Sequence, residues 1–138
     1  MLSVSASAIC SEIRRARWVG HTRCDVIEGR INLIEAARAF NLADDDTVYR
    51  SVGAEEACAL AIHLLHTGLA HPGEIMSVER AKELWREFIG LFAGQDVQLL
   101  TNTLHSTRWT PATEATFDMG LLVIAPNKVG CLWIEEED

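Results

Sequence analysis

Residues 116–134 read TFDMGLLVIAPNKVGCLWI, and this stretch largely sets the fold class. Two extended apolar runs, 116–125 and 128–134, flank Pro126-Asn127 and therefore predict a C-terminal β-hairpin. Proline cannot adopt a positive φ, so a two-residue type I′ turn is excluded and the register stays open by one residue. In either register, apolar residues fall on both faces, and such a hairpin must be covered on both. We expect helices on one face; a subunit partner is a candidate for the other, which makes a homodimer plausible.

Upstream of the hairpin, four segments have the apolar periodicity of helices. They cover residues 4–18, about 25–40, 54–67 and 78–93. Asp25 and Glu28 fit a capping box for the second helix, although a start near Arg30 stays open. The third is apolar nearly all round, which is typical of a buried helix. The fourth has Ser77 as its expected N-cap.

Residues 97–104 form one more candidate strand, so the predicted sheet is small. The fold class is α+β: about four helices packed on an antiparallel sheet of about three strands that ends in the C-terminal hairpin. The length of 138 residues fits one domain, 1–138. Residues 1–94 are expected to be mainly helical and 95–138 mainly β.

The charge is acidic and unevenly distributed. The chain carries −8, yet residues 1–30 hold five Arg against three acids, so the remaining residues carry −10. An acidic body repels phosphate, which makes nucleic acid an unlikely partner and favours a basic one. The basic cluster Arg14, Arg15 and Arg17, together with Arg23, is expected on a solvated face, with phosphate binding as the alternative.

Composition also favours a cytoplasmic protein. No apolar run has the length of a membrane span, so no membrane association is expected. The four cysteines are scattered without a C-x-x-C pair and are expected to be free thiols in a reducing compartment.

No sequence motif points to a cofactor or a metal. Cys58, His63, His66 and His71 gather around the end of the third predicted helix. Their spacing matches no familiar zinc pattern, and histidines near a helix C-terminus also stabilise its dipole. We therefore expect structural histidines. P-loop, G-x-S-x-G and H-E-x-x-H motifs are also missing from the sequence.

The segment 101–118, TNTLHSTRWTPATEATFD, is the candidate binding site. Loops between strands gather polar groups on a rigid frame, and Arg and Trp often dominate interfaces. The candidate residues are His105, Arg108, Trp109, Glu114 and Asp118. The structural alternative has Trp109 as a core plug and Arg108 paired with Glu114 or Asp118.

The acidic tail, residues 135–138, extends the last strand. We expect it to protect the edge of the sheet, with contact to a basic surface as the alternative. The functional hypothesis is a non-catalytic binding protein with a protein partner. By analogy of class alone, this includes bacterial accessory or toxin-neutralising proteins. The alternative is a small hydrolase or metal-dependent enzyme using His105, Glu114 and Asp118.

Overall fold

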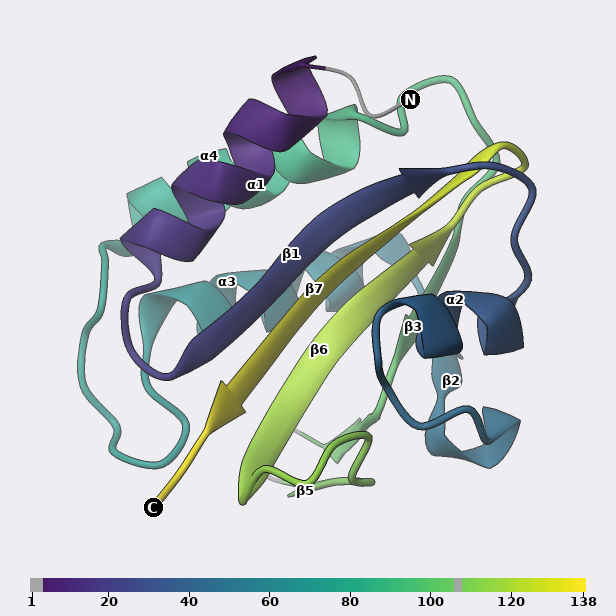
Figure 1. Ribbon diagram of the computed structural model, residues 1–138. Helices are drawn as coiled ribbons and strands as arrows, with labels where there is room; N and C mark the ends of the chain where they lie inside the picture. Colours follow the sequence, from purple (N-terminus) through teal and green to yellow (C-terminus); the bar gives the residue numbers. More distant parts are fainter. Residues whose placement is uncertain (1–3, 106–107) are drawn as a thin grey trace.

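The computed structural model describes residues 4–105 and 108–138, and its centre is a five-stranded antiparallel sheet (Figure 1). The strands, in their order across the sheet, are β1 (His21–Glu28), β7 (Lys128–Glu136), β6 (Phe117–Ile124), β3 (Gln98–Thr101) and β2 (Arg50–Val52). A separate two-stranded ribbon pairs β4 (Thr103–His105) with β5 (Arg108–Trp109). The α+β class is confirmed, but the sheet is larger than the predicted three strands.

The predicted C-terminal hairpin is confirmed and lies inside the sheet. β6 and β7 pair from Phe117↔Glu136 to Ile124↔Val129. The turn covers residues 125–128 and is closed by the Ala125 N–H, which donates to the Lys128 carbonyl at 2.9 Å. A turn longer than two residues is what Pro126 requires.

Four α-helices of the described part of the chain cover the sheet. α1 (Val4–Ala16), α3 (Ala54–His66) and α4 (Val78–Gly90) lie on one face, and the short α2 (Leu33–Ala39) lies on the other (Figure 1). The Ser77 hydroxyl accepts a hydrogen bond from the Arg80 N–H, which confirms the predicted cap of α4. Among the described helices, none is long and apolar enough to cross a membrane.

The prediction of a second helix starting at Asp25 is wrong, because residues 21–28 form β1. Thr22, Cys24 and Val26 are buried in alternation, as in a strand, and all eight residues pair with β7. Helix α2 begins later, where Asn32 and Glu35 form the capping box. Pairing with an interior strand has outweighed the helix-like spacing of apolar residues here.

The third helix is less buried than its composition predicts. Ala57, Ala61, Leu64 and Leu65 face the core, whereas Ala59 and His63 are exposed. Its outer face carries Glu55 and Glu56 as well and is exposed, so the helix is not buried on all sides.

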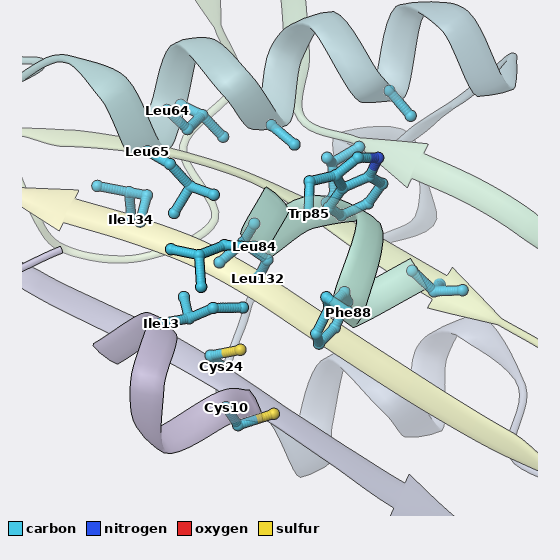
Figure 2. Packing of buried hydrophobic residues seen from close by; sticks show 14 of the residues in the cluster. Cys10, Ile13, Cys24, Leu64, Leu65, Leu84, Trp85, Phe88, Leu132 and Ile134 are labelled. Atoms are coloured by element: carbon cyan, nitrogen blue, oxygen red, sulfur yellow. The ribbon is translucent and has the colours of Figure 1, made fainter. Parts of the chain in front are cut away.

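Two hydrophobic clusters fill the space on either side of the sheet. The larger joins α1, α3 and α4 to one face, through residues such as Ile13, Leu84 and Leu132 (Figure 2). The smaller packs α2 and Tyr49 against Trp133 on the other face. The chain itself thus covers both faces of the hairpin. The argument for a homodimer from an uncovered face does not apply, and the oligomeric state stays a prediction.

The prediction that the acidic tail protects a sheet edge is also wrong for residues 135 and 136. Residues 135 and 136 lie in β7, which is an interior strand between β1 and β6. The long edge strand is β1, where Arg14 donates to the Cys24 carbonyl and the Val26 N–H donates to Asp25 at 2.9 Å. These side chains form hydrogen bonds with backbone groups of the edge strand. Blocking an edge in this way is one means by which proteins limit edge-to-edge pairing.

Arg17 is buried, contrary to the prediction that it lies on a solvated face. Its side chain has 0% exposure and that of Glu136 has 3%, and the two form an ion pair at 2.5 Å. The guanidinium also donates to the carbonyls of Leu64, Val19 and Thr67, and the Glu136 carboxylate accepts from the N–H groups of Leu69 and Ala70. This network attaches the end of β7 to α1 and to the end of α3. A buried charge requires such partners.

Candidate functional site

A groove of about 760 Å³ opens at one end of the sheet. Its walls come from four separate parts of the chain: Arg23 of β1, residues 41–43 after α2, the loop 111–115 between β5 and β6, and the end of β7. The C-terminus and the β5–β6 connection lie at this same end (Figure 1). We call this hollow the acidic groove.

Carboxylates dominate the charge of the acidic groove. Glu114, Glu135 and Glu137 line it together with a single cation, Arg23, so the formal charge of its walls is −2. Arg23 is already engaged by Glu135 and also donates to the Phe40 carbonyl at 3.3 Å. The carboxylates of Glu114 and Glu137 are therefore the groups left to attract a cation.

Glu137 is held in place on the groove wall, although it is exposed. Its carboxylate accepts a hydrogen bond from the Thr116 hydroxyl at 2.6 Å and another from the Thr116 N–H at 3.4 Å. A second hollow of about 400 Å³ shares Ala115, Glu135 and Glu137 with the acidic groove. The acidic surface thus continues past the end of β7.

Asp118, a predicted site residue, is fully buried beneath the loop 111–115 and shapes it. Its carboxylate accepts hydrogen bonds from the N–H groups of Ala112 and Thr113, at 3.1 and 3.4 Å. It also accepts from the Trp133 indole at 3.2 Å and from the Asn102 amide at 3.0 Å. Asp118 fixes the loop that presents Glu114, and it is not positioned to contact a partner.

Asn102 completes this layer, and the sequence reasoning did not single it out. Its amide donates to the carbonyls of Thr110 and Asp118, at 2.8 and 2.9 Å, and its oxygen accepts from the Gly120 N–H. The amide directly after the apolar pair Leu99-Leu100 and Thr101 was the available signal, because a buried polar side chain needs partners in the fold.

The other predicted site residues belong to the β4–β5 ribbon and not to the walls of the acidic groove. Trp109 is half-buried and packs on Phe117, with ring centroids 5.6 Å apart, as the core-plug alternative expects. Arg108 is exposed, and among the described residues it has no ion pair with Glu114 or Asp118. His105 lies opposite Arg108 in β4, and its side chain is outside the described part. Their role in binding stays a prediction.

The catalytic alternative depends on Asp118, whose placement does not suit acid–base chemistry. A general acid or base must reach the reacting group, whereas the Asp118 carboxylate is fully buried and its hydrogen bonds are all to donors of the fold itself. His66 of the possible metal cluster binds the Met76 carbonyl through Nδ1 at 2.6 Å. Among residues 4–105 and 108–138, no three His, Cys, Asp or Glu side chains are grouped to hold a metal ion.

Comparison with known proteins gives no further guide to function. A scan against protein families and searches of curated proteins and of solved structures found no match to this chain.

Proposed function

We propose that this chain is a non-catalytic binding protein that takes a basic segment of a partner protein in the acidic groove. The observation that carries the proposal is the meeting of Glu114 with Glu135 and Glu137 around a groove of about 760 Å³. Complementary charge steers encounter and favours the correct partner. A net charge of −8 adds a long-range attraction for cations.

A protein segment fits the groove better than a small molecule does. Pockets for small ligands are mostly apolar, with a few polar groups that set orientation. The acidic groove has charged and polar walls, and it continues into the second hollow beside Glu136 and Glu137. Such a continuous surface suits an extended chain that presents several Lys or Arg side chains.

A bacterial accessory or toxin-neutralising role is the specific form of this proposal. In that role the acidic groove would cover a basic surface of the toxin and keep it from its target. Gene neighbours bear on this form: a toxin gene adjacent to the gene for this chain would support it, and neighbours confined to metabolism would count against it.

The direct test uses a defined basic probe and matched charge changes. A fluorescein-labelled peptide of alternating Arg and Gly is titrated with the wild-type chain, with Glu114→Gln/Glu137→Gln, and with Glu79→Gln/Glu87→Gln as a control. Both double variants lose two negative charges, but the control pair lies on the exposed face of α4. Fluorescence anisotropy reports the Kd.

We expect the groove variant to weaken binding about tenfold, or about 1.4 kcal/mol, and the control less than about twofold. Binding should also weaken as salt rises to about 0.15 M, because the carboxylates are exposed and screened. Equal losses in the two variants would mean that only net charge attracts the peptide, and the proposed site would then be wrong.

A further inference from the structure

A second groove, of about 440 Å³, lies on the helical side of the molecule, away from the acidic groove. Its apolar wall consists of Ala54 and Cys58 of α3, Trp85 and Ile89 of α4, and Leu99 of β3. We call it the α3–α4 groove. Its size falls within the range of small-molecule sites, roughly 300–1,000 Å³, and its apolar wall is typical of them.

Trp85 provides an unused hydrogen-bond donor in this groove. The residue is only 4% exposed, yet among the described residues its indole N–H has no hydrogen-bond partner. The nitrogen is not among the polar atoms that are sealed from solvent without a partner, so it keeps some contact with solvent, and the residue that carries it lines the groove. In Figure 2 the nitrogen lies on the edge of the ring that faces away from Leu84 and Ile13.

The contrast with Trp133 shows why this donor matters. The Trp133 indole N–H is satisfied by Asp118 at 3.2 Å. A fully buried indole N–H usually finds such an acceptor, whereas the Trp85 nitrogen reaches solvent and donates to water when no ligand is bound. An acceptor atom of a bound ligand would supply for Trp85 what Asp118 supplies for Trp133.

Two cationic side chains line the α3–α4 groove beside its apolar wall. Lys82 and Arg86 line it one helical turn apart on α4, and both are exposed. Within residues 4–105 and 108–138, neither forms an ion pair, whereas Arg17, Arg23, Arg38, Arg50 and Arg80 all do. In a chain of net charge −8, two unpaired cations beside an apolar wall favour an anionic ligand.

We propose that the α3–α4 groove binds a small organic anion with an apolar body, such as an aromatic or aliphatic carboxylate or sulfonate. The apolar body contacts Ile89, Leu99 and the Trp85 ring, and an oxygen of the ligand accepts the indole N–H. Lys82 and Arg86 hold the anionic group at the rim. This site is separate from the acidic groove and does not depend on the function proposed for it.

The probe for the test is 8-anilinonaphthalene-1-sulfonate, whose fluorescence rises in an apolar site. The neutral N-phenyl-1-naphthylamine has the same apolar body without the sulfonate. Three variants are compared with wild type: Trp85→Phe, which keeps an aromatic ring but removes the donor; Lys82→Gln/Arg86→Gln; and the control Arg15→Gln/Arg30→Gln. The control removes two exposed cations elsewhere on the surface. Circular dichroism confirms that each variant is folded.

We expect one saturable site for the sulfonate, with the Kd raised about five- to tenfold by Lys82→Gln/Arg86→Gln and by Trp85→Phe. The control should change the Kd less than about twofold, and the neutral analogue should not respond to the loss of Lys82 and Arg86. If the folded wild type shows no saturable binding, or if both double variants weaken it equally, the proposal is overturned.

Cys58 gives an independent measure of where the probe binds. Its thiol is half-buried in the groove wall, whereas Cys10, Cys24 and Cys131 are buried. A saturating concentration of the sulfonate probe should slow the alkylation of Cys58 by iodoacetamide, and mass spectrometry measures the rate. An unchanged rate of Cys58 alkylation would place the probe elsewhere and overturn the assignment.

Discussion

Replacing Glu136 by Gln tests whether the buried pair with Arg17 holds the end of β7 in place. The substitution keeps the shape of the side chain and removes its charge. The Arg17 guanidinium then stays buried with no charged partner, next to the carbonyls of Val19, Leu64 and Thr67. Burial already lowers the pKa of Arg17, and Glu136 opposes that shift.

The expected loss of stability is large for a substitution that only replaces one carboxylate oxygen by an amide NH₂ group. Removing one partner of a buried ion pair costs about 3–5 kcal/mol, because the other charge remains desolvated. In Glu136→Gln, an amide N–H₂ or oxygen must also replace the carboxylate oxygens that accept from Leu69 and Ala70. An amide has one acceptor oxygen, so one set of donors loses its partner. We expect a loss at the upper end of that range.

Urea unfolding followed by circular dichroism measures the free energy of unfolding of each variant. Glu137→Gln is the matched control, since Glu137 is exposed one residue away, and should change stability by less than about 0.5 kcal/mol. Arg17→Met in the Glu136→Gln background should cost less than the sum of the single changes, because the double variant has no unpaired buried charge. A loss below about 1 kcal/mol for Glu136→Gln would refute this account of β7.

Three further predictions concern stability and reactivity. Gly120→Ala should destabilise the fold by about 3 kcal/mol in urea unfolding, because the new Cβ would lie 2.4 Å from the Trp133 ring; Gly90→Ala, which meets no atom within 4 Å, should instead stabilise it by about 0.5–1 kcal/mol. Tyr49 is the single tyrosine, and burial raises the pKa of its hydroxyl. The unfolded state therefore ionises first, stability should fall from about pH 10 upward, and Tyr49 absorbance should change only as the chain unfolds; early ionisation in the folded chain would contradict this. With Ellman's reagent under native conditions, Cys58 should react first, and rapid reaction of more than one thiol would show that the buried cysteines are accessible.

The elements that were predicted correctly are those that local sequence patterns specify whatever segments they pack against. The spacing of apolar residues in α4 and its Ser77 cap specify that helix wherever it packs. The apolar runs on either side of Pro126 likewise specify the hairpin. Residues 25–28 were mispredicted as the start of a helix because their apolar spacing fits both a helix and a strand, and the pairing of β1 with β7, at least 100 residues away, decides between them.

The candidate site was predicted only in part, for a related reason. Glu114 lies in the acidic groove, as a binding role requires, but Asp118 is a buried support for its loop. The sequence shows that both residues are acidic and lie near a turn, but it does not show which of the two faces solvent. The hydrogen bonds from Asn102 and Trp133 to Asp118 make that distinction.

By itself, the sequence determined the α+β class, the C-terminal hairpin and the acidic charge, because these follow from residue types and short periodicities. Only the tertiary structure decided that β7 lies inside the sheet and that Arg17 and Glu136, 119 positions apart, neutralise one another in the interior. It also brought Arg23, residues 41–43 and 111–115, and the side chains of Glu135 and Glu137 together around one groove. Contacts between distant segments depend on how the elements pack, and no local pattern encodes that packing.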